Sequence, residues 1–473
     1  MKEKAAYGKG EISPWAWVST LYFAEGIPYF IVNTISVIMF KNMGMSNGDV
    51  AMYTGLLYLP WVIKPLWSPF VDIIRTKRWW VVAMQVVMSV AFALAAFSLP
   101  HPSPEVIEAG HTPVSLFSVT LVIFWIAAFA SATHDIAADG YYMLALDSRR
   151  QSLFVGIRST FYRLASIFGQ GVLVVIAGIL ETTSGDIPRA WFITMLICAV
   201  LFACLTLYHS LILPKELSGR FESGYPVRRS ADPDASPAAD VRTGPGRTHV
   251  PVRSMSGRVV GIFREFGRTF ATFFMKRHVW IAILFMLLYR LPEAFLLKMM
   301  NPFLLDPEDI GGLGLSTENV GIVYGTVGVA ALTIGGIIGG IAASRLGLKR
   351  SLWPMALSMT LPCLTFVYLS MFQPHSILVI SLCVLIEQFG YGFGFTAYML
   401  YMMHFSEGEF KTSHYSICTA FMALSMMLPG MVAGYLQEWL GYTGFFWMVM
   451  ASCLATLAVT VSVRRLLRPD DMH

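Results

Sequence analysis

Twelve long apolar stretches limit what this chain can fold into. A helix needs about 20 apolar residues to cross the hydrocarbon of a bilayer, and strands of a membrane barrel would be about ten residues long and alternate in polarity. The sequence therefore predicts an all-α membrane protein of 12 transmembrane helices, numbered here from one to twelve. They lie near residues 15–40, 50–72, 79–99, 115–146, 152–181, 189–213, 278–301, 318–343, 350–372, 376–404, 412–437 and 441–464.

Composition excludes the soluble classes. Of 473 residues only 13% are charged and 56% are hydrophobic, whereas soluble proteins carry about 25% charged residues. The net charge of +5 calls for no nucleic acid. The six cysteines lie in apolar runs without a CxxC pair or a His at ligand spacing. We therefore expect no metal, no cofactor and no nucleic-acid partner, and a lipid bilayer around the chain.

The short loops differ in charge between the two sides of the membrane. Lys and Arg gather at the N-terminus and in the turns near 75–78, 149–150, 345–350 and 464–468. The opposite loops carry only Lys41 and Arg189, together with several acids. Because cytoplasmic loops are enriched in Lys and Arg, we expect both termini in the cytoplasm. No cleavable signal pattern precedes the first apolar run, so we expect it to stay as a helix.

One long polar segment, 214–277, divides the chain into two bundles of six helices, 1–213 and 278–473. Its first part is rich in Pro, Ala, Asp and Arg and cannot build a core. Near 258–275, Phe and Val recur at helical spacing opposite basic residues. This pattern predicts an amphipathic helix lying on the cytoplasmic leaflet. Docking of a partner protein is the alternative.

Helices one and seven echo each other. LYFAEGIPYF in helix one and LLYRLPEAFL in helix seven each place Pro beside ionisable residues, near the middle of the bilayer. Pro must kink helix one at this point. Paired interrupted helices at matching positions of two repeats indicate a substrate site at the midplane between them.

Charged residues inside spanning helices need a reason, because each costs about 2.5–3.5 kcal/mol on insertion scales. Counting from the turn between antiparallel helices four and five places Asp139 level with Arg158, and Asp135 level with Arg163. We expect these two ion pairs. They either only join the helices or form a cytoplasmic gate and relay. His134 is either a proton shuttle beside Asp135 or a packed core histidine.

Glu25, Asp135 and Glu387 are the candidate proton carriers. Glu25 precedes Gly26 and Pro28, near the midplane, and burial of a carboxyl group favours its protonated form. A structural pair of Glu25 with Lys64 is the alternative. Asp135 is the second candidate, but Arg163 at equal depth would hold it ionised. Glu387, in the other bundle, is expected to share the proton.

Six motifs follow one another along the chain: FAEGIPYF, KPLWSPFVD (Lys64 to Asp72), ASATHDIAADGYYM (Ala130 to Met143), YRLASIFGQG (Tyr162 to Gly171), LLYRLPEAF (Leu287 to Phe295) and VGIVYGTVG (Val320 to Gly328). Together they resemble the AmpG-like family of the major facilitator superfamily. The related acetyl-CoA transporters share the LWSP-x-x-D and DI-x-x-D elements. The resemblance covers nearly the whole chain except 214–257, and it implies the major facilitator fold of two six-helix bundles.

The resemblance implies a symporter of the bacterial inner membrane that imports its solute with protons, without ATP, by alternating access. The family's best-known cargo is the anhydro-muropeptide released by cell-wall turnover, which links the family to peptidoglycan recycling. Relatives carry siderophores or acetyl-CoA. Two positions depart from muropeptide permeases: Glu25 replaces a small polar residue, and Gly325 replaces Lys. We expect a monomer.

A muropeptide has amino sugars and several carboxylates, so the resemblance implies a site of cations and aromatic rings. The residues expected there are Lys64, Arg163, Arg290, Glu293, Tyr22, Tyr29, Trp61, Tyr289, Tyr391 and Tyr398. Two alternatives stay open. Glu293 can pair with Arg290 at i, i+3, and the aromatic stripe of helix ten can serve helix packing alone.

The turns after helices two and eight resemble the facilitator gate. Asp72 with Arg75 and Arg78 is expected to form an acid–base latch that favours the outward-facing state, with Asp139 and Arg158 as further gating residues. After helix eight, Arg345 keeps the basic part, but Ser344 takes the acidic position. Only the first turn should therefore latch strongly.

Two other functions compete with transport. An enzyme would need a nucleophile–base pair, a metal cluster or a phosphate-binding loop, and the sequence has no GxSxG, HExxH or Walker A motif. A receptor or scaffold would not explain carboxylates at the midplane near broken helices. Charges spread over six helices suit a translocation path.

Overall fold

The computed structural model describes residues 13–110, 112–146, 148–214, 264, 267–408 and 410–467, and the elements in these ranges are helices. Ten of these helical segments are long and apolar enough to cross a membrane. The last, Ser413–Leu466, consists of two helices that meet at Gly441, whose backbone is not helical. Helix two is built from the two shorter helices α3 and α4. The twelve predicted crossings are thus present.

The first half has six crossings, and several consist of more than one segment. They are α1 (Pro14–Phe30) with η2 (Ile31–Ile35) and α2 (Ser36–Asn42); α3 (Asn47–Leu56) with α4 (Leu59–Ile73); α5 (Lys77–Ser98); α7 (Ser118–Ala145); α8 (Ser148–Ser166) with η4 (Ile167–Leu173) and α9 (Val174–Ser184); and α10 (Ile187–Ile212). The short α6 (Pro104–Glu108) and η3 (Val114–Phe117) join α5 to α7.

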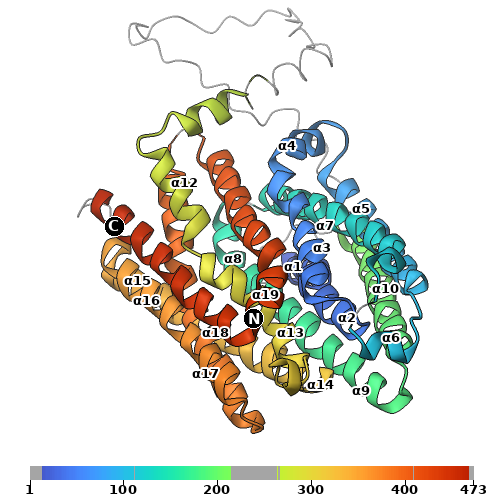
Figure 1. The fold of residues 1–473 in the computed structure, drawn as a ribbon. Helices are drawn as coiled ribbons and strands as arrows, with labels where there is room; N and C mark the ends of the chain where they lie inside the picture. Colours follow the sequence, from blue (N-terminus) through green and yellow to red (C-terminus); the bar gives the residue numbers. More distant parts are fainter. Residues whose placement is uncertain are drawn as a thin grey trace, which may run out of the picture.

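The second half repeats the arrangement. Its crossings are α12 (Val279–Leu288) with α13 (Leu291–Leu305); α14 (Thr317–Val320) with η8 (Gly321–Gly328) and α15 (Val329–Leu346); α16 (Leu348–Thr360) with η9 (Leu361–Cys363) and α17 (Leu364–Phe372); α18 (Ile377–Phe405); and the two parts of α19 (Lys411–Leu466). Figure 1 shows the two halves side by side, the first in blue to green and the second in yellow to red.

The buried core differs between the two ends of the molecule. At the end where α2 and α13 finish, one apolar cluster spans both halves, for example from Phe40 to Phe303 and Val320. Toward the opposite end, where α10 ends and α12 begins, each half has a cluster of its own, around Tyr141 in the first half and Phe285 in the second. We call these the closed end and the linker end.

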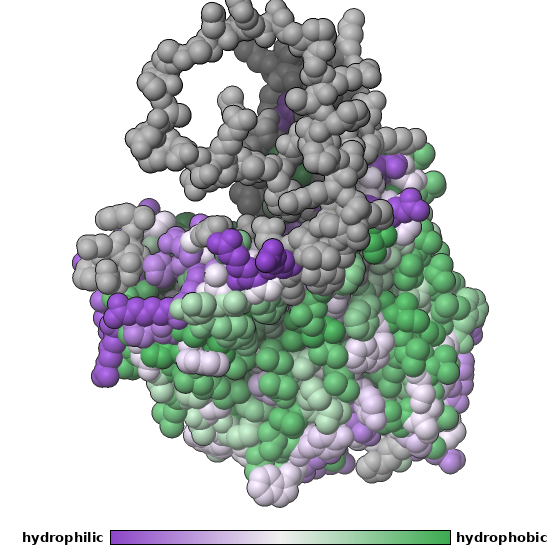
Figure 2. All heavy atoms as spheres, turned by 90° about the horizontal axis from the view of Figure 1, so that it is seen from above, coloured by the Kyte–Doolittle hydropathy of each residue, from purple (hydrophilic) through white to green (hydrophobic). Residues whose placement is uncertain are grey.

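The outer surface is apolar over a wide area, as a membrane protein requires. Leu211, Trp280 and Trp439 expose 70%, 73% and 80% of their surface. Figure 2 shows broad hydrophobic surface with hydrophilic residues gathered mainly along its margins. A shallow apolar hollow of about 400 Å³ lies on this surface between α5 and α7, lined by residues such as Met84, Trp125 and Phe129.

The predicted interruption of helix seven is confirmed. The chain leaves the α-helix at Leu288 and resumes it at Leu291, with Pro292 in the first turn of α13. A break frees carbonyl groups that need donors. Tyr398 donates its hydroxyl to the Met286 carbonyl (2.7 Å), and Thr456 donates to that of Tyr289 (3.1 Å). The carbonyl groups freed by the break therefore have hydrogen-bond donors, and Arg290 lies at the centre of the break.

Helix one behaves differently from its repeat. The α-helix continues through Pro28 to Phe30 and turns π-helical only at Ile31–Ile35. Asn33 donates to the Tyr29 carbonyl (3.0 Å) and Ser36 to that of Val32 (2.5 Å). Side chains therefore supply hydrogen bonds to backbone carbonyls in and next to the π-helical turn. The irregularity lies one turn beyond the predicted position.

Helices five and eight cross where both are π-helical. Segments η4 and η8 touch each other, and a Cβ atom added at Gly325 would collide with the Gln170 carbonyl of η4. The crossing therefore depends on a glycine in the second half packed on the backbone of the first. Position 325 thus holds glycine, where muropeptide permeases have Lys, because a larger side chain would not fit this helix crossing.

We expect Gly325→Ala to destabilise the protein by about 1–3 kcal/mol, the usual cost of overpacking, because two backbones must separate. Thermal unfolding in detergent measures this. Gly340→Ala is the matched control, since an added Cβ on this glycine of α15 meets nothing within 4 Å. Equal melting temperatures of the two variants would contradict the prediction.

Only part of the predicted amphipathic helix lies within the described residues. Residues 267–274 are helical. Phe273 is fully buried, and its ring packs against those of Phe405, Phe421 and His414 at the linker end of the second half. Phe274 and Met275 remain exposed. The position of this helix on a leaflet stays a prediction.

Candidate functional site

The first half buries an acid–base cluster between helices one, two and four. Lys64 Nζ of α4 lies 2.6 Å from Asp135 Oδ2 of α7. The carboxyl group of Glu25, on α1, lies close to the Asp135 carboxyl. Glu25 is only 7% exposed, and its Oε2 has no partner among the described residues. Two carboxyl groups therefore lie beside one cation. One of them can be ionised opposite that cation while the other carries a proton.

The expected pairing of helices four and five is half right. Arg158 Nη2 lies 2.8 Å from Asp139 Oδ1, as predicted. The pairing of Asp135 with Arg163 was wrong, because Lys64 occupies that acid. Arg163 extends toward Gly336 of helix eight instead. The two arginines are five residues apart, about 140° around a helix, so they cannot serve the same neighbour.

Tyr22, expected in the substrate group, contacts the Asp139–Arg158 pair. Its hydroxyl donates to Asp139 Oδ1 (3.0 Å), and the Arg158 guanidinium lies 4.5 Å from its ring centroid. Tyr142 flanks the same guanidinium at 5.7 Å. The half-buried pair is therefore braced by two aromatic rings from helices one and four.

Arg290 organises the site in the second half. Its guanidinium donates to the Tyr391 hydroxyl and lies 4.7 Å from the ring centroid of Phe395. The alternative pair with Glu293 does not form. Since Arg290 precedes α13 with φ −102° and ψ 13°, the two residues lack the geometry of a helical i, i+3 pair.

Glu293 faces another acid. Its carboxyl group lies close to that of Glu387, on α18, and both side chains are buried. Gln388 donates to Glu387 Oε2 (2.8 Å), while both oxygens of Glu293 lack a partner among the described residues. Two adjacent buried carboxylates cannot both be ionised, so this pair also holds a proton.

The predicted aromatic residues divide into two groups. Tyr29 and Trp61 pack edge to face at 5.2 Å in the first half, with Tyr58 beside Tyr29 at 6.2 Å. Tyr29 has charged neighbours from both halves, Arg290, Asp135 and Lys64. Tyr29, Trp61 and Tyr391 remain candidates for substrate contact.

Tyr289 and Tyr398 form part of the core of the second half. Both are fully buried and stack at 5.6 Å. Their hydroxyls donate to the carbonyls of Gly394 (3.1 Å) and Met286 (2.7 Å). These contacts favour helix packing, the alternative given for the stripe of helix ten, at Tyr398, and Tyr289 of helix seven packs with it.

His134 lies in a separate buried network of the first half. Its Nε2 is 3.0 Å from Gln85 Nε2, and Gln85 also contacts His209 Nδ1 at 2.9 Å. His209 Nε2 continues to Thr20 at 3.0 Å. The structure thus supports the packed histidine over the shuttle beside Asp135. No group of three or more metal-binding side chains occurs in the residues that were described.

The basic residues expected in the latch are seen at the linker end without their acid. Arg78 donates to the carbonyls of Leu213 (2.9 Å) and Ser210 (2.5 Å) within the first half. Arg75 and Arg345 are exposed, and Arg75 lies 5.9 Å from the Trp79 ring. The side chain of Asp72 lies outside the described residues, so the latch itself stays a prediction.

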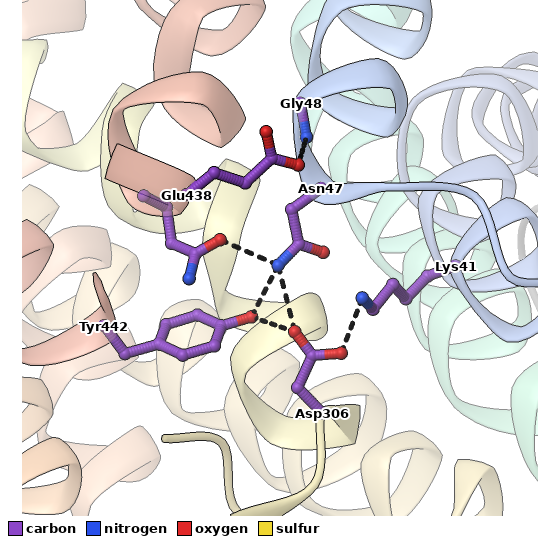
Figure 3. A network of polar contacts seen from close by, with 7 residues as sticks. Lys41, Asn47, Gly48, Asp306, Glu438 and Tyr442 are labelled. Atoms are coloured by element: carbon purple, nitrogen blue, oxygen red, sulfur yellow. Dashed lines mark hydrogen bonds and ion pairs between the residues drawn. The ribbon is translucent and has the colours of Figure 1, made fainter. Parts of the chain in front are cut away.

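The closed end carries a polar network that joins the halves (Figure 3). Lys41 Nζ, at the end of α2, lies 2.5 Å from Asp306 Oδ1, at the end of α13. Asp306 Oδ2 accepts from Asn47 (2.9 Å) and from Tyr442 (2.5 Å). Asn47 also donates to Gln437 (2.8 Å). One buried carboxylate therefore joins helices one, two, seven and twelve, and Asn47 extends the network to helix eleven.

A comparison with known families identifies this architecture. Residues 18–413 match the family described as Major Facilitator Superfamily. The chain belongs to the major facilitator superfamily. It is therefore a transporter and not an enzyme.

Two relatives align with almost the whole of this chain. The putative transporter AmpG 4 of Rickettsia conorii is 23% identical over 453 residues, which are 93% of this chain and 94% of that protein. The anhydromuropeptide permease of Escherichia coli K12 is 24% identical over 459 residues, 94% of this chain and 79% of that protein. The resemblance to the AmpG-like family is thus confirmed.

A solved structure shows the same fold. A bacterial homologue of the human lysosomal transporter Spinster, crystallised inward-facing and unoccupied, superposes with a TM-score of 0.62 at 13% identity, over 97% of each chain.

Sequence reasoning missed the residues that close this facilitator. Lys41 was predicted only as a loop charge, and Asp306 is one of the acids in the loops on the same side. Lys41 was one of two cations on its side of the membrane, and a lone cation near acids is a signal for an ion pair. Asn47, Gln437 and Tyr442 gave no signal, because such residues are common at helix ends.

Proposed function

We propose that this facilitator imports an anionic cell-wall muropeptide, or a similar amphipathic solute, together with protons. The observation that carries the proposal is the buried Glu25 carboxyl beside the Asp135–Lys64 pair. Lys64 holds Asp135 ionised, so the exchangeable proton belongs to Glu25. Similarity to an anhydromuropeptide permease supports the cargo. A siderophore or an acyl-CoA is the alternative cargo.

The basic loops support one orientation in the membrane. Arg75 and Arg345 are exposed at the linker end, and cytoplasmic loops carry the excess of Lys and Arg. The linker end is then cytoplasmic, and the closed end faces the periplasm of a bacterial inner membrane. A protein closed on the periplasmic side is inward-facing. In that state the cytoplasmic latch of Asp72 is expected to be open.

Uptake into proteoliposomes tests the proposal. Labelled anhydro-muropeptide is offered with the outside one pH unit more acidic than the inside, at zero membrane potential. One proton per solute then supplies about 1.4 kcal/mol, which is a tenfold accumulation. A siderophore and acetyl-CoA are run in parallel. Uptake that stays the same when a protonophore removes the gradient would contradict proton coupling.

A further inference from the structure

Lys298 is a buried cation without a partner. It lies on α13, is 7% exposed, and its Nζ has no hydrogen-bond partner among the described residues. The centroid of the Tyr58 ring lies 5.9 Å from Nζ. A lysine in a spanning helix is costly and usually serves a substrate or ion path.

This lysine lies between the two halves of the transporter. Tyr58, at the start of α4, belongs to the first half. On another side is Gly430 of helix eleven, where an added Cβ would come no closer than 3.9 Å to the lysine side chain. Lys298 is eight residues before Asp306, so it lies inside the closed end.

The charges of the site are unbalanced. Lys64 and Arg158 are each paired with an aspartate. Three other cations, Arg163, Arg290 and Lys298, have no carboxylate within ion-pair distance in the part of the chain that the structure describes. The Glu293–Glu387 pair supplies at most one negative charge when it holds its proton. The space between the halves therefore favours a solute with more than one negative charge.

We propose that Arg290 and Lys298 bind two separate anionic groups of one elongated solute. They are eight residues apart along helix seven, a spacing of roughly 12 Å. Arg290 is fixed by Tyr391 and can hold a carboxylate with its planar fork, while Lys298 acts as a point charge beside Tyr58. The proposal rests on the proposed transport function and adds the number and spacing of the charges on the substrate. It gives Lys298 the role that the sequence assigned to Lys64.

Binding of two related compounds tests this. One is anhydro-muropeptide with its acidic peptide, which has several carboxylates, and the other is the same anhydro sugar acid without the peptide, which has one. We expect Lys298→Met to raise the Kd of the peptide-bearing compound by about tenfold or more, the loss of one charged contact. The Kd of the sugar acid should stay nearly unchanged. Lys298→Arg should keep the preference.

Controls separate this proposal from the transport function. Arg189→Met removes an exposed cation at the closed end and should change neither Kd. Lys298→Gln gives a second neutral variant if the Met variant does not fold. If the wild-type protein binds neither compound, the proposed cargo is wrong, and this inference with it. If it binds both and Lys298→Met weakens both equally, or neither, the function stands and the second anion site is refuted.

Discussion

Glu25→Gln is expected to abolish uphill uptake driven by a pH gradient and to leave solute exchange at equal pH largely intact. The glutamine keeps the shape of the side chain but cannot load and release a proton. Exchange needs only the substrate site and the movement of the halves, and both remain. Proteoliposomes measure the two activities side by side, with the gradient present in one and absent in the other.

The environment of Glu25 explains why this acid and not its neighbour should carry the proton. Asp135 lies 2.6 Å from the Lys64 ammonium, and a positive charge at this distance favours the ionised form. Glu25 Oε2 has no partner among the described residues. Protonation of Glu25 therefore removes a repulsion between two carboxylates, whereas protonation of Asp135 would break an ion pair.

Two further variants make the test specific. Glu25→Asp keeps a carboxyl group and should retain part of the uphill uptake. Glu105→Gln removes an exposed acid far from this cluster and should have no effect. If Glu25→Gln still concentrates the solute against its gradient, then Asp135 or Glu387 becomes the leading candidate.

The sequence predicted the spans well because their signal is local. Apolar length and basic turns lie within single segments, so each crossing could be read without its neighbours. The break before Leu291 was also predictable, since Pro292 acts on its own helix. The π-helical crossing at Gly325 was not, because it depends on how helix eight meets the backbone of helix five.

The charged residues of the site show the same limit. Equal depth in the membrane correctly paired Asp139 with Arg158, but it cannot tell which face of a helix a side chain occupies. Lys64 reached Asp135 from helix two, a contact between segments 71 residues apart. Glu293 likewise met Glu387 instead of Arg290. The depth of a side chain depends on its position along one helix. Its partners depend on how that helix packs against its neighbours.

Asp306→Asn is expected to open the closed end and shift the transporter toward the outward-facing state. The Asp306 carboxylate is 3% exposed and accepts from Lys41, Asn47 and Tyr442. Removing one partner of a buried ion pair costs about 3–5 kcal/mol, because Lys41 is left without its counter-charge. The bonds from Asp306 to Lys41 and Asn47 exist only while the halves touch, so this cost falls on the inward-facing state alone.

Spin labels at two exposed positions on either side of the closed end, Ser184 and His375, measure the change. Their distance distribution should move to longer values in Asp306→Asn. Asp309→Asn is the matched control, since this acid lies three residues away and is exposed. An unchanged distribution in Asp306→Asn, or the same shift in both variants, would show that the network does not hold the halves together. A shift confined to Asp306 would establish that one carboxylate at the end of helix seven sets the balance between the two states.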